Sequence, residues 1–239
     1  MIPLHDDNPT EITPAVTISL IVLCVLVFIW QVLLGGQARQ AIVYSLGVIP
    51  AVLLDRVSLP DELVLVPAHL TVFTSMFLHG GILHLAGNML YLWIFGNNVE
   101  DTMGHFRFVV FYLLCGIAAV IGQVLQNPDS QIPMIGASGA ISGVLGAYLL
   151  LYPHARVLVA IPLGIILYTV RLAAGWVLGF WFIIQITSSV MADPDKVGVA
   201  WFAHIGGFLA GMALIPLFKY RRVPLFHPAH GTKRWHKRI

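Results

Sequence analysis

The sequence predicts an all-α polytopic membrane protein with six transmembrane helices, and two features of its composition carry that prediction. Hydrophobic residues make up 58% of the 239 residues and charged residues only 10%, with a mean hydropathy of +0.86. Soluble domains carry roughly 25% charged residues. So little charge cannot cover the surface of a soluble protein of this length. The composition therefore excludes an ordinary soluble enzyme, a disordered protein and a nucleic-acid-binding module.

Long runs without charged residues locate the helices, since a span needs about 20 apolar residues. We predict six spans: Val16–Leu34, Ile82–Phe95, Phe108–Leu125, Gly136–Leu151, Leu172–Val190 and Trp201–Phe218. A seventh apolar stretch, Val157–Tyr168, contains Pro162 and Gly164. Because it is short and broken, we expect an interfacial or re-entrant connector there. Met1–Glu11 has no Lys or Arg, so no signal peptide is predicted and the first helix should stay in the mature protein.

The basic residues predict how the chain is oriented and divided. We expect a short N-terminal segment over residues 1–14, a six-helix membrane domain over 15–220 and a basic tail over 221–239. With six spans both termini share one side of the membrane, and ten of the 13 Lys and Arg residues fall on that side. The positive-inside rule therefore predicts cytoplasmic termini. The second, fourth and sixth helices then all begin in the outer leaflet.

Acidic residues and cysteines limit the chemistry that the bundle can perform. All 11 Asp and Glu residues, among them Glu100 and Asp101, fall outside the predicted spans. A proton relay or ion path built on embedded carboxylates would therefore have no carboxylate to use. Cys24 and Cys115 lie in different apolar runs, and we expect buried thiols there rather than a disulfide.

Polar side chains lie near the start of three predicted helices, where they are functional candidates because polar groups are rare in lipid. His84 and Asn88 are four residues apart, so they project from one face of the second helix. Ser138 lies near the start of the fourth helix and His204 near the start of the sixth. Because these helices begin in the same leaflet, the four side chains can meet at one depth. His79 precedes the second helix and is expected to brace a loop.

Glycines on the fourth and sixth helices favour the close approach that such a meeting needs. Gly139 with Gly143, and Gly207 with Gly211, form small-xxx-small pairs, which let helix backbones approach tightly in lipid. A hydroxyl and an imidazole on neighbouring helices then reach hydrogen-bond distance, roughly 2.6–3.2 Å. Taken singly, each feature has a plainer explanation. Gly-rich faces are common in membrane bundles, a lone Ser such as Ser142 bonds to its own helix, and a lone His can be a packing residue.

The order and form of these motifs resemble the rhomboid family of intramembrane serine proteases, particularly its bacterial members. The matching stretches are His79-x4-His84-x3-Asn88, Gly136-Ala137-Ser138-Gly139 and Ala203-His204-x2-Gly207-x3-Gly211. The run from Asn88 to Asp101 is also similar, and the resemblance covers about residues 15 to 220. It implies a rhomboid-like six-helix bundle in a bacterial inner membrane. No metal, organic cofactor or nucleic acid is implied, and the expected partners are the lipid bilayer and transmembrane substrates.

The resemblance also implies roles for the polar residues. Ser138 is the nucleophile and His204 the general base of a dyad without an acidic third member. Asn88 and His84 join the backbone N–H of Ser138 in an oxyanion hole, where fixed donors stabilise the developing charge. The implied substrates are single-span membrane proteins, cut in or near their outer-leaflet part. Gly, Pro or polar residues there would help the substrate chain to leave its helix.

Two positions depart from the family pattern. Many members carry a Trp-Arg pair in the first outer loop, where this sequence reads His69-Leu70-Thr71. Some members stack an aromatic residue on the catalytic histidine one turn after the nucleophile, and Ser142 stands at that position here. We therefore expect other contacts to orient His204, such as packing on the side of Gly207.

Other interpretations remain open at this point. A catalytically inactive rhomboid-like adaptor would bind transmembrane segments without cutting them, but Ser138 and His204 are both retained. A transporter or channel would need embedded charges or an inverted repeat, and neither is evident. Metal binding would use histidines of the helices or of the tail, and no HExxH-like spacing supports it. The histidines concerned are His79, His84 and His204, or His227, His230 and His236. The tail is instead predicted to be a basic membrane-surface segment.

The fifth predicted span is rich in aromatic residues, and two explanations of them stay open. They either form a gate that admits the substrate or face the lipid as an aromatic stripe. The residues concerned are Trp176, Phe180, Trp181 and Phe182.

Overall fold

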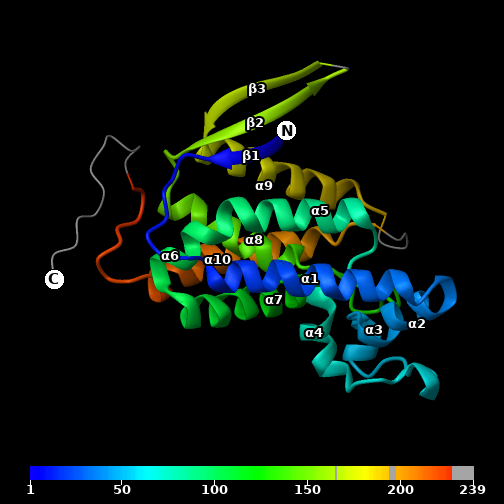
Figure 1. Cartoon of the computed structure of the whole chain (residues 1–239). Coiled ribbons are helices and arrows are strands. Elements are labelled where there is room, and N and C mark those ends of the chain that lie inside the picture. The colour runs from blue at the N-terminus through cyan, green and yellow to red at the C-terminus, as the bar shows by residue number, and fades with distance from the viewer. Residues whose placement is uncertain (165, 194–197, 228–239) are drawn as a thin grey trace.

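A computed structural model describes residues 1–164, 166–193 and 198–227, and this part of the chain is mostly helical with one small sheet (Figure 1). In chain order the elements are β1 (Ile2–Asp6), α1 (Ala15–Leu33), α2 (Gly36–Leu46), α3 (Pro50–Leu53), η1 (Asp61–Leu63), η2 (Ala68–Leu70), α4 (Thr71–Thr74), η3 (Ser75–Phe77), α5 (Ile82–Tyr91), η4 (Leu92–Gly96), α6 (Asn97–Met103), α7 (His105–Gln126), α8 (Ser138–Leu151), β2 (Arg156–Leu163), β3 (Ile166–Ala173), α9 (Ala174–Met191) and α10 (Trp201–Phe218).

Four of the described helices are long and apolar enough to cross a membrane: α1, α7, α9 and α10. A fifth candidate is the helical run Ile82–Met103 together with the segment Asp61–Phe77, from which it is bent by 81°. α8 is apolar but only 14 residues long. The polytopic helical architecture is thus present, and the count of six spans stays a prediction.

Predicted and observed helices agree best for the first and sixth spans. α10 has the bounds expected for the sixth span, and α1 is shifted by one residue from the first. The predicted third and fourth spans correspond to α7 and α8. The tail is described only as far as residue 227. His230, His236 and the basic residues after position 227, as well as Lys196, lie outside the described residues.

The prediction of an all-α fold is wrong, because Val157–Tyr168 is part of a β-hairpin. β2 and β3 pair in antiparallel register from Arg156 opposite Ala173 to Leu163 opposite Ile166. β1 pairs antiparallel with β2, so the N-terminal residues complete a three-stranded sheet. Short apolar runs fit a strand as well as a buried helical segment, and the many β-branched residues here favour the strand.

The sheet lies along one side of the helical bundle. β1 contacts α5 and η4, while β2 and β3 contact α9 (Figure 1). The hydroxyl of Tyr148 on α8 donates a 2.5 Å hydrogen bond to the buried carboxylate of Asp6. The Asp7 carboxylate accepts a 2.8 Å hydrogen bond from the backbone N–H of Arg156. Burial raises the pKa of Asp6 to about 6, so this anchor of the sheet is a group held out of water.

The second predicted span is longer than expected, because α5 continues through the π-helical turn η4 into α6 and ends at Met103. Glu100 and Asp101, which follow the predicted span Ile82–Phe95, therefore lie on the same helical run. Glu100 is fully buried, and its carboxylate accepts hydrogen bonds from the backbone N–H groups of Val16 and Thr17 at 2.9 and 2.8 Å. Glu100 is thus a buried carboxylate on the same helical run as the second predicted span, and its place outside the membrane stays a prediction.

The position of Glu100 explains why a buried carboxylate is tolerated. It lies at the start of α1, whose first N–H groups have no partner within the helix, and negative charge is favourable there. His105 contacts the same carboxylate at 2.6 Å. Glu100 is 12 residues beyond Asn88 on the same helical run, about 18 Å along the axis. It therefore caps a helix at the end of the bundle remote from Asn88.

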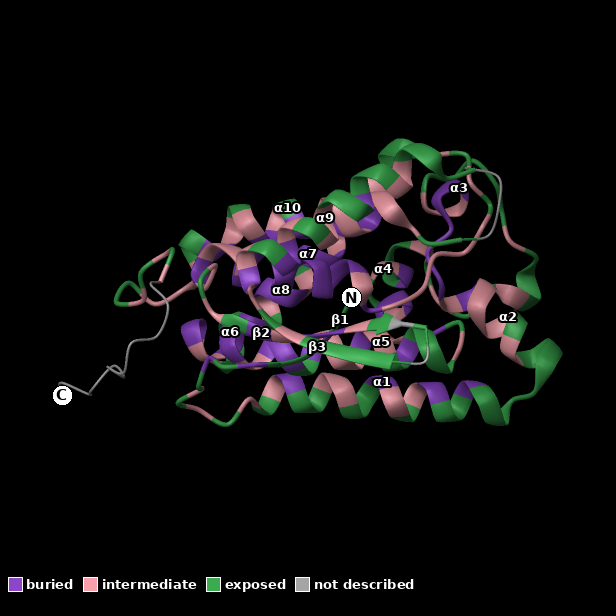
Figure 2. Cartoon of the chain, turned by 90° about the horizontal axis from the view of Figure 1, so that it is seen from above, coloured by how far each residue is buried: buried purple, intermediate pink, exposed green. Residues whose placement is uncertain are grey.

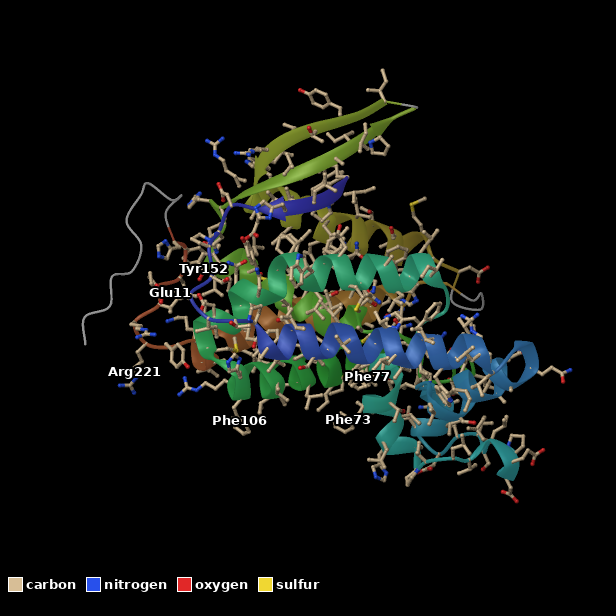
Figure 3. All side chains as sticks on the ribbon, in the orientation of Figure 1. Glu11, Phe73, Phe77, Phe106, Tyr152 and Arg221 are labelled. Carbon is tan, nitrogen blue, oxygen red and sulfur yellow. The ribbon has the colours of Figure 1, made fainter. Side chains whose placement is uncertain are left out.

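The start of α1 and the ends of α8 and α10 lie at this same end of the bundle. Glu11 before α1, Tyr152 after α8 and Arg221 after α10 gather there, away from α2, α3 and α4 (Figure 3). Phe106 on α7 points outward from the bundle and is 81% exposed (Figure 3). An exposed aromatic ring on a helix of spanning length is the surface that lipid would cover. The start of α1 and the end of α10 thus lie at one end of the bundle, and the side of the membrane on which the chain termini lie remains a prediction.

α8 is the most buried helix of the bundle and packs directly on α10 (Figure 2). A Cβ atom on Gly207 would lie 2.0 Å from the carbonyl oxygen of Gly139, and one on Gly211 would lie 1.9 Å from that of Gly143. A Cβ on Gly146 would similarly meet the Phe208 carbonyl oxygen at 2.2 Å. The two backbones therefore touch, with no room for a side chain between them.

Replacing Gly211 by alanine is expected to lower the unfolding temperature of the detergent-solubilised protein. The added Cβ would meet the backbone of Gly143, which can give way only if α8 and α10 separate. Overpacking of this kind costs about 1–3 kcal/mol. Differential scanning fluorimetry would measure the shift.

Gly179→Ala on α9 is the matched control, because nothing lies within 4 Å of the Cβ position. Alanine also favours a helix over glycine, so this variant should unfold at the wild-type temperature or above it. Equal unfolding temperatures for the two variants would contradict the close contact between α8 and α10.

Candidate active site

Ser138 and His204 lie in direct contact between α8 and α10. Ser138 is the first residue of α8, and His204 lies in the first turn of α10. The Nε2 atom of His204 is 2.8 Å from Oγ of Ser138. Both residues are partly buried. The structure thus brings together the hydroxyl and the imidazole that the sequence singled out, at the helix ends where the spacing placed them.

The other ring nitrogen of His204 contacts a residue that the sequence analysis did not identify. Nδ1 lies 2.8 Å from Oε1 of Gln185 on α9. Gln185 is only 3% exposed, and its amide nitrogen donates a 3.0 Å hydrogen bond to the carbonyl oxygen of Trp181. A Gln within a long apolar run was the signal that could have revealed it.

Aromatic contacts to His204 also differ from the expectation. The rings of Trp181 and Trp201 lie 6.0 and 6.1 Å from the imidazole, measured between centroids. Gly207, expected to help orient the histidine, instead packs on the Gly139 backbone. Ser142 donates a 2.6 Å hydrogen bond to the carbonyl oxygen of Ser138, as predicted for a serine that bonds to its own helix.

His84 and Asn88 lie on α5 beside the backbone that leads into Ser138. Nδ1 of His84 accepts a 3.4 Å hydrogen bond from the N–H of Gly80, so the ring proton lies on Nε2. A Cβ atom on Gly136 would lie 2.8 Å from that Nε2 and 3.7 Å from Nδ2 of Asn88. Glycine is needed here because a side chain would meet His84, and also because φ is +124°, a backbone conformation that favours glycine. Both donors therefore face the turn that precedes the serine.

Two N–H donors at this turn, the side chain of Asn88 and the backbone of Ser138, are available to an incoming oxygen. Nδ2 of Asn88 is buried and has no hydrogen-bond partner within the described part of the chain. Buried polar groups are seldom left unpaired, so such a donor calls for a ligand. The backbone N–H of Ser138 is among the first of α8, which have no intrahelical partner, and it lies at the positive end of the helix dipole.

His79 braces the loop before α5, as the sequence predicts. Its backbone N–H donates a 3.0 Å hydrogen bond to Oε1 of Gln31, and its Nδ1 lies 3.2 Å from the Phe77 carbonyl oxygen. Its ring packs edge-on against His84, with centroids 5.2 Å apart. Arg39 donates a 3.0 Å hydrogen bond to the carbonyl oxygen of Gly80 in the same loop. These contacts fix the start of α5 and hence the position of His84.

A cavity of about 1440 Å³ adjoins the site, and its lining includes Asn88, Ser138 and His204. The lining also includes the exposed side chains of Gln40 and Gln126, so the cavity reaches the protein surface. Water can therefore reach the serine from outside the bundle. Its volume is also large enough to hold more than a single side chain of a ligand.

The aromatic residues of α9 face two directions. Trp176 is 78% exposed and Phe180 is 49% exposed, as expected of a lipid-facing stripe. Trp181 contacts His204, and Phe182 stacks on Phe208 with centroids 4.3 Å apart. The lipid-facing explanation thus fits Trp176 and Phe180, while a gating role for this helix stays a prediction. The inward pair supports the site, and the outward pair fits lipid contact.

Three comparisons relate the chain to known proteins. Over 143 residues it is 36% identical to RHOMBOID-like protein 6, mitochondrial, of Arabidopsis thaliana, covering 60% of this chain and 41% of that protein. Over 140 residues it is 35% identical to Rhomboid protease GluP of Bacillus subtilis, covering 59% of this chain and 24% of that protein. Over 230 residues it is 28% identical to the presenilin-associated rhomboid-like protein, mitochondrial, of Mus musculus, covering 87% of this chain and 55% of that protein. The chain thus spans about half or less of the length of these relatives.

Residues 68–221, more than half of the chain, match the Rhomboid domain. This region includes Asn88, Ser138 and His204, the residues that meet at the cavity. Bacterial and mitochondrial proteins both occur among the relatives, so the bacterial inner membrane stays a prediction. With its helices of spanning length, the chain is an integral membrane protein that belongs to the rhomboid family.

Proposed function

We propose that this protein is an intramembrane serine endopeptidase, which hydrolyses peptide bonds in or near the outer-leaflet part of single-span membrane proteins. The observation that carries the proposal is the 2.8 Å contact between Nε2 of His204 and Oγ of Ser138. A serine hydroxyl is a weak nucleophile unless a base within hydrogen-bond reach removes its proton. The contact lies at the wall of a cavity that reaches the surface, where a peptide and water can both enter.

The reaction then follows from the positions of the Ser138 hydroxyl and the His204 imidazole. Oγ of Ser138 attacks the scissile carbonyl carbon while Nε2 of His204 takes the hydroxyl proton. The tetrahedral intermediate collapses, and His204 gives the proton to the leaving amine. A water molecule from the cavity then attacks the acyl-enzyme while His204 takes its proton. The bond between the acyl carbon and Oγ breaks, His204 returns the proton to Oγ of Ser138, and the carboxylic acid product leaves.

The charge on the intermediate would be stabilised by the donors that face Gly136. An oxyanion next to Ser138 would lie beside the Ser138 backbone N–H and the buried Nδ2 of Asn88, which has no hydrogen-bond partner among the described residues. His84 adds a donor at Nε2, because its Nδ1 is occupied as an acceptor. Neutral donors fixed before the reaction suit a site with little water, since they need no reorganisation as charge develops.

Substitution of the two reacting residues tests the proposal directly. Ser138→Ala or His204→Ala should abolish cleavage of a single-span membrane protein by the purified enzyme in detergent, because each removes a group that takes part in bond making. A fluorophosphonate probe should label the wild type and fail to label Ser138→Ala. Cleavage that persists in both variants would overturn the dyad, and a wild type that neither cleaves nor labels would favour an adaptor.

Asn88→Ala is expected to lower kcat by about 10²–10³ while substrate binding stays close to that of the wild type, as for the loss of one oxyanion donor. Initial cleavage rates over a range of substrate concentrations would separate the two parameters. Asn97→Ala is the matched control, because Asn97 lies on the same helical run and its side chain bonds only to the adjacent Asn98 N–H among the described contacts. If both variants cleave at the wild-type rate, Asn88 has no part in the oxyanion hole.

A further inference from the structure

We propose that Gln185 is a positioning residue for His204, which fixes the tautomer and the direction of its ring and so takes the place of the acidic third member of a triad. The inference rests on the proposed function. It assigns a role to α9, a helix that the sequence motifs do not include. Gln185 does not touch the reacting atoms and acts only through the histidine.

The hydrogen bond from Gln185 to Trp181 determines which group donates in the hydrogen bond between Gln185 and His204. Its amide nitrogen is 3.0 Å from the carbonyl oxygen of Trp181, which can only accept, so the NH2 group faces that carbonyl. The amide oxygen therefore faces Nδ1 of His204 at 2.8 Å. An amide oxygen also can only accept, so the proton of the neutral ring lies on Nδ1.

The proton on Nδ1 determines what the other nitrogen can do. Nε2 keeps its lone pair and accepts the hydrogen bond from the Ser138 hydroxyl, 2.8 Å away. This is the arrangement that a general base needs before attack. In the other tautomer Nε2 would carry the proton and could not take one from serine. The contact made by Gln185 therefore selects the reactive form of the histidine.

Burial explains why an amide serves here better than a carboxylate. Gln185 is 3% exposed and lies on a helix of spanning length, where an ionised group would lose its hydration. Both ends of its amide are paired by His204 and Trp181, so the side chain is satisfied without charge. A neutral acceptor orients the ring as a carboxylate would and stabilises the imidazolium less strongly.

Kinetics of two variants test the role. Gln185→Leu keeps the volume and removes the acceptor, and we expect kcat to fall by about 10–10² with KM within about twofold, less than the 10⁴ reported for the wrong tautomer in a charged triad. Burial favours the protonated carboxyl in Gln185→Glu, which keeps an acceptor oxygen toward Nδ1 and an O–H toward the Trp181 carbonyl oxygen, so this variant should be at least about tenfold more active than Gln185→Leu. Thr187→Val is the control on the same helix, since this exposed side chain bonds only to its own helix among the described contacts and should leave kcat unchanged.

A kcat for Gln185→Leu within about twofold of the wild type would overturn the proposal. An equal fall in kcat in the leucine and glutamate variants would overturn it as well, because the fall would then result from altered packing and not from the missing hydrogen-bond acceptor. If the leucine variant does not fold, as judged by its unfolding curve, Gln185→Met is the second variant without an acceptor and the same criteria apply.

A spectroscopic measurement separates this inference from the proposed function. ¹⁵N NMR of protein labelled at the histidine side chains, assigned by difference from His204→Ala, should show the His204 proton on Nδ1 in the wild type and a shift toward Nε2 in Gln185→Leu. A wild-type proton on Nε2, or an unchanged tautomer in the variant, would contradict the role of Gln185. A wild type that shows the expected tautomer yet neither cleaves nor labels would instead contradict the proposed function.

Discussion

The contact between the backbones of α8 and α10 determines where the reacting groups lie. In lipid no hydrophobic force drives helices together, so association depends on close packing. Gly207 and Gly211 meet the carbonyl groups of Gly139 and Gly143, and any larger residue would part the helices. Ser138 directly precedes Gly139, and His204 lies three residues before Gly207. The packing that stabilises the bundle therefore also sets the distance between hydroxyl and imidazole.

Neighbouring helices complete the site with groups that carry no fixed charge. α9 contributes the amide of Gln185 to His204, and α5 contributes Asn88 beside the turn at Gly136. A carboxylate is present in the same helical run as Asn88, yet Glu100 is used to cap α1 about 18 Å away. Charge is thus placed where backbone N–H groups compensate it, while the candidate site relies on dipoles.

Local sequence predicted the groups of the site better than it predicted the contacts between them. Ser138, His204 and Asn88 were identifiable because a polar residue in an apolar run is rare. The β2–β3 hairpin was missed because a broken apolar run of that length fits either structure. Gln185 was missed because its partner lies on another helix, 19 positions along the chain, and no spacing rule links them. The burial of Glu100 depends likewise on the start of α1, which only the tertiary fold brings to it.

A structure of the protein after reaction with a phosphonate inhibitor would test the central claim most directly. Phosphorus should be bonded to Oγ of Ser138, with the phosphoryl oxygen within hydrogen-bond distance, about 2.7–3.1 Å, of the Ser138 N–H and of Nδ2 of Asn88. Nδ1 of His204 should still contact Gln185 in that adduct. A phosphonate bonded to another residue, or a phosphoryl oxygen turned away from Asn88 and the start of α8, would contradict the site as described.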